Sequence, residues 1–499
     1  KGETDGSSFP SGGLRATFEA RGYTAWDPAS YAFVKDGTLY IPTAFCSYTG
    51  EALDTKTPLL RSMDAISEQS LRILRLFGDT TTTRVTTTVG AEQEYFLVDR
   101  QKYLQRKDLI FTGRTLFGAM PPKGQELDDH YFGAIKPRVQ AFMKSVDEEL
   151  WRLGVLAKTE HNEAAPAQHE LAPIFTTTNI ATDHNQITME AMQKIAKKHG
   201  MVCLLHEKPF AGVNGSGKHN NWSISTNTGA NLLEPGETPA ENAQFLLFLC
   251  AVIKAVDDYQ DLLRISIASA GNDHRLGGHE APPAIISIFL GEELTDVLTS
   301  IAKGVHHDNT ERIKMNMGSE VIPSIRKDNT VRNRTSPFAF TGNKFEFRML
   351  GSASSISDVN VMLNTMVAEV FSDFADKLEK ADDFESEINL IIKDVMKKHK
   401  RIIFNGDGYS EEWKQEAARR GLTNICHVPE AIMKFNAPQS KAVLLGENIF
   451  NENELNCRIE VEFEKFTKKV QIESRVLGDL AINHIIPTAV IYQNRLLEN

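Results

Sequence analysis

The sequence has few cysteines, no excess of basic residues and no long apolar run, and each absence excludes a class of protein. Its five cysteines are widely spaced and form no C-x-x-C pair, which argues against a disulfide framework or a cysteine zinc site. We therefore expect buried, inert thiols. The formal net charge of -11 argues against a nucleic-acid-binding protein, whose surface would be basic. The longest apolar run, residues 245–253, is far too short to cross a bilayer.

Targeting signals are also missing from the sequence given. It opens on no signal-peptide pattern, and its N-x-S/T sequons at Asn214, Asn221 and Asn333 fall within segments that we assign to chemistry below. A glycan there would block that chemistry. We expect a cytoplasmic protein that binds neither membrane nor nucleic acid.

Three regions differ in composition and periodicity, and we take them as domains. In the first region, residues 1–88, the part up to about residue 57 is rich in Gly, Ser, Thr and aromatic residues, with a strand-like stretch at 38–41, and a helix and a Thr-rich connection follow. Residues 89–360 mix short alternating strands with helices, and residues 361–499 are mostly helical. The clearest helical patterns, several with capping residues at their ends, cover residues 59–77, 140–153, 240–263 and 411–420.

Two segments of the middle region carry paired carboxylates. Residues 90–98 have the aromatic and β-branched content of a strand, so Glu92 and Glu94 should project from one face. Residues 161–170 add Glu163 and Glu170, with two imidazoles, around a proline bend. Neighbouring carboxylates repel unless cations lie among them. Taken alone, the first pair is better explained by a solvated strand face, and a surface turn explains the second pair as well as a cation site does.

A third segment, residues 212–225, begins like a phosphate-binding G-x-x-x-x-G-K loop. His219 stands where that loop needs Ser or Thr, and the flanking sequence lacks the strand before it and the helix after it. We interpret the segment as a glycine-rich turn that leads into a strand, with His219 and Ser223 on one polar face. A single histidine in such a strand is more often a structural hydrogen-bonding residue than a metal ligand.

The fourth segment alternates strictly, with Lys344, Glu346 and Arg348 on one face and two phenylalanines on the other. An exposed, salt-bridged strand explains this segment alone. Together, however, the four segments supply five carboxylates, one histidine on a strand and several arginines. Oxygen-rich sites with one imidazole suit magnesium or manganese, and arginines suit carboxylate and phosphate. The combination favours metal-assisted phosphoryl transfer onto an acid.

The same segments resemble a known family. The motifs G-x-E-x-E-[YF], E-x-x-P-x-Q-x-E, N-G-S-G-x-H and N-R-[ST], the last followed by x-E-x-R, occur in the order found in the glutamine synthetases. Residues 5–8, D-G-S-S, are similar to another motif of that family. The resemblance spans residues 5 to about 350. Residues 271–275 and 333–340, with the helical C-terminal region, resemble the type III branch.

The resemblance implies a role for each matched residue. Glu94, Glu163 and Glu170 correspond to ligands of one divalent metal, and Glu92, His219 and Glu346 to ligands of a second. The remaining matched residues correspond to groups that bind substrates or act on them: Asn214, Gly215, Arg275 and Arg348 for glutamate; Asp5, Tyr131 and Glu163 for ammonium; Ser223 for the nucleotide; Arg334 for the transferring phosphoryl group; and Glu280 for the flap that shields the intermediate.

The implied activity joins ammonia to glutamate with ATP as co-substrate and two or more Mg²⁺ or Mn²⁺ ions. Glutamate is first phosphorylated because hydroxide is a poor leaving group, and an anionic pocket then deprotonates ammonium. Two departures from the family pattern are Ala339, where short members have an arginine, and Lys344, where arginine is commoner. Arg275 and Glu280 also lie one residue closer together than in the short members.

The implied fold is α+β: an N-terminal β-grasp-like domain, incomplete here, and a large catalytic domain whose curved antiparallel sheet is flanked by helices, with a helical C-terminal extension. Because the D-G-S-S motif comes early, we expect the chain to lack N-terminal sequence. Family members form stacked rings, usually dodecamers, with active sites between subunits. Two alternatives remain: a ligase for a bulkier amine, and a non-catalytic structural relative.

Overall fold

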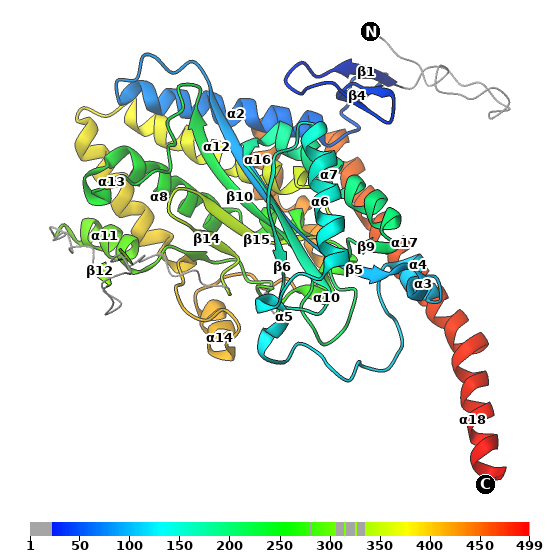
Figure 1. The fold of residues 1–499 in the computed structure, drawn as a ribbon. Helices are drawn as coiled ribbons and strands as arrows, with labels where there is room; N and C mark the ends of the chain where they lie inside the picture. Colours follow the sequence, from blue (N-terminus) through cyan, green and yellow to red (C-terminus); the bar gives the residue numbers. More distant parts are fainter. Residues whose placement is uncertain (1–21, 279–280, 306–313, 316–324, 327–334, 499) are drawn as a thin grey trace.

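The computed structural model describes residues 22–278, 281–305, 314–315, 325–326 and 335–498, and its centre is a nine-stranded sheet (Figure 1). Every pair in the sheet is antiparallel except β11 with β14. The strands in spatial order are β11 (Ile288–Phe289), β14 (Phe338–Phe340), β15 (Phe345–Gly351), β10 (Gly217–Thr226), β5 (Val85–Asp99), β7 (Gln168–Pro173) and β6 (Ala157–Asn162), while β8 (Thr176–Thr177) and β9 (Met201–Leu204) also pair with β5.

The N-terminal part that is described forms two small sheets and a long helix. Strands β1 (Gly22–Trp26) and β4 (Thr43–Ser47) make one pair, and β2 (Phe33–Lys35) and β3 (Thr38–Tyr40) make the other. The strand expected at 38–41 is thus confirmed. Helix α2 (Lys56–Leu76) follows, with apolar residues on its buried face, and the chain leaves it through Gly78 at a φ of 87°.

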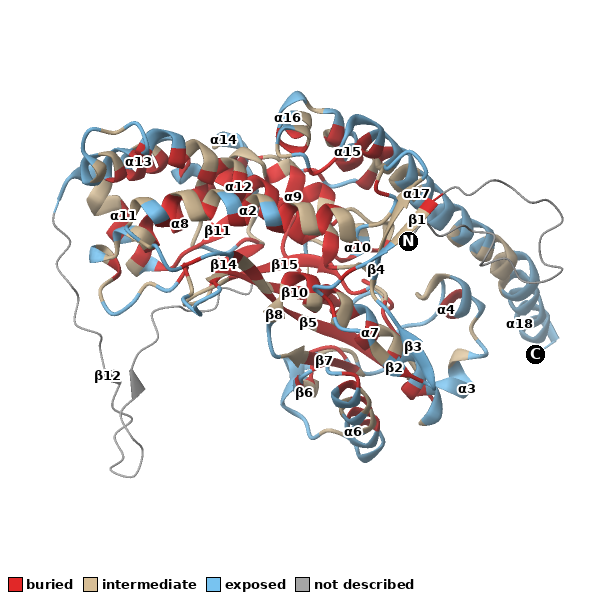
Figure 2. Ribbon diagram, turned by 90° about the horizontal axis from the view of Figure 1, so that it is seen from above, coloured by how far each residue is buried: buried red, intermediate tan, exposed pale blue. Residues whose placement is uncertain are grey.

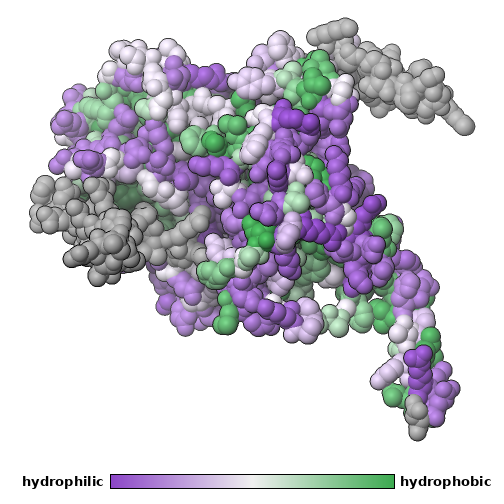
Figure 3. Space-filling view, viewed as in Figure 1, coloured by the Kyte–Doolittle hydropathy of each residue, from purple (hydrophilic) through white to green (hydrophobic). Residues whose placement is uncertain are grey.

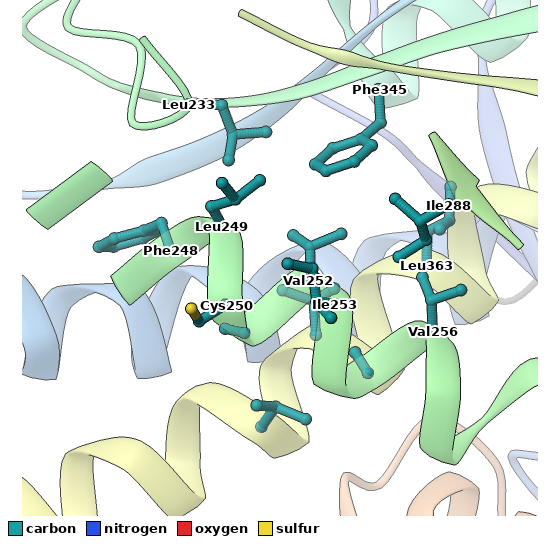
Figure 4. Close-up of a cluster of buried hydrophobic side chains, with 14 of the residues drawn as sticks. Leu233, Phe248, Leu249, Cys250, Val252, Ile253, Val256, Ile288, Phe345 and Leu363 are labelled. Carbon is teal, nitrogen blue, oxygen red and sulfur yellow. The ribbon is translucent and has the colours of Figure 1, made fainter. Parts of the chain in front are cut away.

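The main core lies between the sheet and three long helices, α2, α8 (Ala243–Asp258) and α12 (Ser357–Leu378). Figure 2 shows α8, α12 and the central strands as almost wholly buried. Figure 4 shows Phe345 of β15 directed toward the apolar side chains of α8. Strand β15 is therefore anchored by its apolar face, which leaves its other face for polar residues.

The single helix expected over residues 240–263 is wrong in detail. The structure has α8 and then α9 (Gln260–Ser266), and Tyr259 between them leaves helical geometry with φ −118° and ψ 27°. The N-terminus of α8 begins only after Asn242, whose side chain accepts a hydrogen bond from the Phe245 amide. Capping and tertiary packing therefore set these ends, as apolar content alone could not.

Most of the other helices cover the edges of the sheet or form the C-terminal part. Helix α14 matches its prediction, because the Ser410 side chain accepts from the Trp413 amide and Gly421 follows at a φ of 71°. These helices are α3 (Arg100–Tyr103), α4 (Lys107–Thr112), α5 (Asp129–Phe132), α6 (Pro137–Arg152), α7 (Thr178–Lys198), α10 (Ala270–Arg275), α11 (Glu292–Lys303), α13 (Phe384–Lys398), α14 (Glu411–Arg419), α15 (Val428–Met433), α16 (Pro438–Gly446), α17 (Glu452–Leu480) and α18 (Ile486–Glu498).

The fold class is the mixed α+β one expected, with a large sheet, flanking helices and a helical C-terminus, while the domain boundaries at 88 and 360 stay predictions.

The expectation for the cysteines is wrong in part. Cys203 and Cys250 are buried, but Cys426 and Cys457 are exposed. The face of the molecule shown in Figure 3 is largely hydrophilic. Among the residues described, none of the helices combines the length and apolarity needed to span a membrane.

Candidate active site

Three neighbouring strands bring a histidine and two glutamates together. Strand β10 lies between β5 and β15, and its register places His219 opposite Glu92 and Asn221 opposite Glu346. The His219 Nδ1 atom lies 2.9 Å from Glu92 Oε2 and 3.2 Å from Glu346 Oε1. Asn221 Nδ2 donates to Glu92 Oε1 at 2.9 Å. The strand register, rather than any loop, thus sets the positions of these groups.

Burial and hydrogen bonding shift the pKa values of His219 and Glu92 in opposite directions. Although burial and the positive charge of Arg348 oppose protonation of His219, its hydrogen bonds to Glu346 and Glu92 raise its pKa well above the ordinary value. Burial would raise the pKa of Glu92, but the His219 hydrogen bond lowers it overall. The trio is therefore an anionic site that already attracts a cation.

A second group of carboxylates lies beside the first, toward the other edge of the sheet. Glu94 on β5 is opposite Glu170 on β7, and His161 on β6 is opposite Glu170 in turn. His161 Nε2 lies 3.0 Å from Glu170 Oε1, and its Nδ1 lies 3.6 Å from Glu163 Oε1. The Glu170 hydrogen bond raises the pKa of His161 to about 9. His219 links the two groups, since its Nε2 is 3.7 Å from Glu94 Oε1.

These residues fit divalent metal ions. Three trios have their ligand atoms within 4.8 Å of one another, close enough to share one ion. Each trio combines two carboxylates with one imidazole, a donor set that suits Mg²⁺ or Mn²⁺. Because the carboxylates are mostly buried, they would repel one another without cations among them. The trios are Glu92–His219–Glu346, Glu94–Glu170–His219 and His161–Glu163–Glu170.

A cavity of about 990 Å³ opens over the first trio. Its lining includes Glu92, Glu346 and Ser223, together with Lys158 and Lys344. The Ser223 hydroxyl contacts Asn231 Oδ1 and the Asn343 carbonyl, each at 2.9 Å. The cavity has the size of a small-molecule site, and its two lysines suit a phosphate-bearing ligand.

The residues expected to hold glutamate lie next to the carboxylates and are all buried. Asn214 and Gly215 form the turn before β10, and a Cβ atom at Gly215 would lie 2.3 Å from the Glu207 carbonyl oxygen, so only glycine fits there. Arg348 Nε is 3.4 Å from Glu346 Oε1. The Arg275 guanidinium donates to the carbonyl oxygens of Arg348 and Met349, at 3.1 and 3.2 Å. In this structure Arg275 therefore supports the β15 backbone.

Tyr131 lies at the second group, with its ring centroid 5.9 Å from that of His161. Asp5, Glu280 and Arg334, expected to act on ammonium, the intermediate and the phosphoryl group, lie outside the described residues. Ala339, where the short members of the resembled family have an arginine, lines the cavity. The structure thus brings the described candidates to one face of the sheet, and their individual roles stay predictions.

Sequence reasoning missed several residues that contact the candidates. His161 was noted only as an imidazole, although its place two residues before Glu163 was a usable signal. Gln168, the glutamine of the E-x-x-P-x-Q-x-E motif, has no role assigned from the sequence, and it donates to the Gly215 carbonyl at 2.8 Å. His130 Nδ1 lies 2.6 Å from the Glu163 carbonyl. Gln125 contacts Asn214 from 89 residues away. No local pattern in the sequence indicates the last two contacts.

Three family models match the chain. They describe the glutamine synthetase type III N terminal (residues 1–62), the glutamine synthetase catalytic domain (73–286) and the glutamine synthetase C-terminal domain (387–499). Similar proteins include a glutamine synthetase of Bacteroides fragilis (58% identical over 504 residues, covering 100% of this chain and 69% of that one). A type-3 glutamine synthetase of Dictyostelium discoideum is 51% identical over 506 residues with the same coverage of both chains.

A solved structure supports the fold. The glutamine synthetase of Plasmodium falciparum superposes with a TM-score of 0.57 over 94% of this chain and 88% of its own, at 14% identity. At that identity the likeness concerns the arrangement of strands and helices alone.

Proposed function

Because this chain belongs to the glutamine synthetase family and carries its catalytic domain, we infer that it catalyses the ATP-dependent ligation of ammonia to L-glutamate. The products are L-glutamine, ADP and phosphate, and the intermediate is γ-glutamyl phosphate. The observation that carries this proposal is the meeting of Glu92, His219 and Glu346 on three adjacent strands, within 4.8 Å of one another, beside a cavity large enough for a nucleotide.

We assign two divalent ions to the carboxylates. Glu92, His219 and Glu346 would hold one Mg²⁺ or Mn²⁺, and Glu94, Glu163 and Glu170 the other. When bound, such ions supply positive charge that neutralises the phosphoryl oxygens during transfer. The preference for Mg²⁺ or Mn²⁺ rests on the donor set: carboxylate oxygens with a single imidazole.

The other residues would orient the substrates and move one proton. Asn214, Gly215, Arg348 and, with the family, Arg275 would bind glutamate, with its γ-carboxylate directed to the second group of carboxylates. Ser223 would contact the nucleotide. Glu163 would accept the proton of ammonium, since an ionised carboxylate both binds the cation and removes its proton. The predicted roles of Asp5 and Tyr131 (ammonium), Arg334 (phosphoryl group) and Glu280 (flap) belong to the same proposal.

The proposal extends to the assembly. Residues 1–21, which contain Asp5, would complete a neighbouring subunit's site in a homo-oligomer, with the family's stacked rings and dodecamer as the expected form. A cytoplasmic location is part of the proposal and rests on the family alone. Symmetric homo-oligomers are the commonest soluble assemblies, which agrees with this expectation.

The test is phosphate release from ATP with Mg²⁺, measured in the full-length assembly with glutamate, ammonium, both or neither. Wild type should turn over only with both, and Glu346→Gln should lose at least about 100-fold of that rate. Glu237→Gln, an exposed glutamate on the surface, serves as the matched control. Turnover that needs a larger amine would identify the alternative ligase. Intact assemblies without any turnover would support the structural relative.

A further inference from the structure

A single side-chain amide holds Asn214 at two points. Gln125 Nε2 donates to Asn214 Oδ1 at 2.7 Å, and the Asn214 backbone N–H donates to Gln125 Oε1 at 2.8 Å. Asn214 itself is buried, with 2% of its surface exposed. Its backbone and its side chain are thus fixed by the same partner, which lies 89 residues earlier in the chain.

These two bonds determine which way the Asn214 amide faces. A backbone N–H can only donate, so the oxygen of Gln125 must face it, and the nitrogen of Gln125 must then face the Asn214 side chain. That nitrogen also donates to Asp128 Oδ1 at 2.9 Å, which favours the same orientation. The Asn214 oxygen is therefore turned toward Gln125, and its Nδ2 donor is turned away. A donor at that position suits the carboxylate of an amino acid.

Gln125 belongs to a segment, residues 113–136, that contacts two parts of the active site: Asn214, proposed to bind glutamate, and the second group of carboxylates. Besides Asn214, the segment reaches the second group of carboxylates, where His130 contacts the Glu163 carbonyl. The Asn162 side chain donates to the Gly133 carbonyl at 3.0 Å. The segment also contains Leu127 and Asp128 at positive φ, 58° and 50°. Non-glycine residues adopt this conformation only when their surroundings impose it.

The start of the segment is anchored independently of the site. Arg114 forms a two-bond ion pair with Glu473 of α17, at 2.9 and 2.6 Å, and the Thr115 amide donates to the Pro209 carbonyl at 2.9 Å. The position of Gln125 therefore does not depend on Asn214 alone. Such an anchored partner can orient a residue without itself being moved by it.

We propose that Gln125 is a positioning residue for glutamate: its amide fixes the backbone and the side-chain orientation of Asn214, so that Asn214 presents a donor to the substrate carboxylate. This inference rests on the proposed function, in which Asn214 binds glutamate. Gln125 does not touch the reacting atoms, so its loss should weaken glutamate binding more than it slows the chemical step.

The experiment compares Gln125→Ala, Gln125→Glu and the control Gln140→Ala, an exposed glutamine on α6, in the full-length assembly. Loss of two hydrogen bonds should raise the KM for glutamate about tenfold or more, with KM for ATP and ammonium changed less than about twofold. The Glu variant keeps the size and the acceptor but cannot donate, so Asn214 should turn its oxygen outward. Its KM for glutamate should therefore rise at least as much as that of Gln125→Ala.

Direct glutamate binding by calorimetry, with Mg²⁺ and a non-hydrolysable ATP analogue, and the melting temperature of each variant complete the test. Normal melting with selectively weakened glutamate binding in both variants is the expected result. Rescue by Gln125→Glu would show that only side-chain volume matters and would overturn the inference. An equal rise in all three KM values would overturn it too. Wild type without glutamate-dependent turnover would instead refute the proposed function, and this inference with it.

Discussion

The two halves of the active site are built in different ways. The first, Glu92, His219 and Glu346, comes entirely from paired strands, and each residue's neighbours in the chain are themselves buried. We call it the strand-built half. The second, Glu94, Glu163 and Glu170 with His161, has Glu163 in the turn between β6 and β7, with residues 113–136 packed against it. We call it the loop-supported half.

The difference has a physical consequence. In the strand-built half, backbone ladders and buried phenylalanines fix the ligand atoms before any substrate binds, so the geometry is preorganised. In the loop-supported half, the position of Glu163 depends on individual hydrogen bonds such as the one from His130 to its carbonyl oxygen, and each is worth only about 1 kcal/mol. Substitutions in the strand-built half should therefore lower stability and metal binding. Substitutions in the loop-supported half should cause smaller defects that are specific to one substrate.

The largest effect is expected from removing the support of the strand-built half. Phe345 is fully buried between the sheet and α8, and Phe345→Ala should lower the free energy of unfolding by about 3–5 kcal/mol. Urea unfolding followed by circular dichroism measures the change. The control is Phe132→Ala, a residue that is 81% exposed beside the loop-supported half, with an expected loss below about 0.5 kcal/mol. Equal losses in the two variants would contradict the comparison.

The next largest effect is expected from substituting the proposed metal ligands themselves. Glu92→Gln and Glu163→Gln should each weaken the binding of one Mn²⁺ ion by more than about 100-fold, because even changes to outer-shell partners cost 10- to 100-fold. Calorimetric titration of the protein without nucleotide would resolve the two ions. Each variant should lose a different binding event and keep the other. Loss of both events in Glu92→Gln would mean that the two halves do not bind metal independently.

The strand-built half was also the more predictable from sequence. Alternation in residues 90–98 and 344–348 placed Glu92 with Glu94 and Glu346 with Arg348 on common faces, because a strand has a period of two. Which strands pair, and so which carboxylate meets His219, came from the family resemblance and is now visible in the register. The helical regions followed from apolar spacing, but the break at Tyr259 did not, since Tyr259 packs against two apolar clusters whose members are far apart in the sequence.

The loop-supported half could be predicted only in part. Glu163 and Glu170 lay within a motif, whereas Gln125 and His130 lie in a segment without periodicity and act through hydrogen bonds that span 89 and 33 residues. Such contacts leave no local trace in one sequence, since any polar residue is compatible with a loop. The positions of Asp5, Glu280 and Arg334 stay predictions.

A smaller effect is expected from His130. His130→Ala removes the hydrogen bond to the Glu163 carbonyl, so kcat/KM for ammonium should fall about five- to tenfold, with the melting temperature nearly unchanged. Steady-state kinetics with ammonium as the varied substrate measures this fall, and His427→Ala, an exposed histidine before α15, is the control. A loss confined to glutamate binding would mean that His130 supports Asn214 rather than Glu163.

The last expected effect concerns the pH dependence of unfolding. Glu160 lies on β6, three residues before Glu163, and burial together with the Asp147 carboxyl raises its pKa to about 9. Because the folded protein keeps this proton while the unfolded chain loses it near the ordinary value of 4.5, unfolding releases the proton between these values. The unfolding free energy should therefore fall as pH rises through this window, by about 1 kcal/mol per pH unit.

The variant Glu160→Gln removes this titration while keeping the shape of the side chain. It should melt at a higher temperature than wild type at pH 8, and the difference should shrink toward pH 5, because near the ordinary pKa of 4.5 the unfolded chain begins to bind the proton as well. Thermal melting across pH 5–9 measures the trend, with Glu148→Gln, an exposed glutamate on α6, as control. If the difference between Glu160→Gln and wild type is the same at every pH, the buried carboxyl of Glu160 does not set the pH dependence of unfolding.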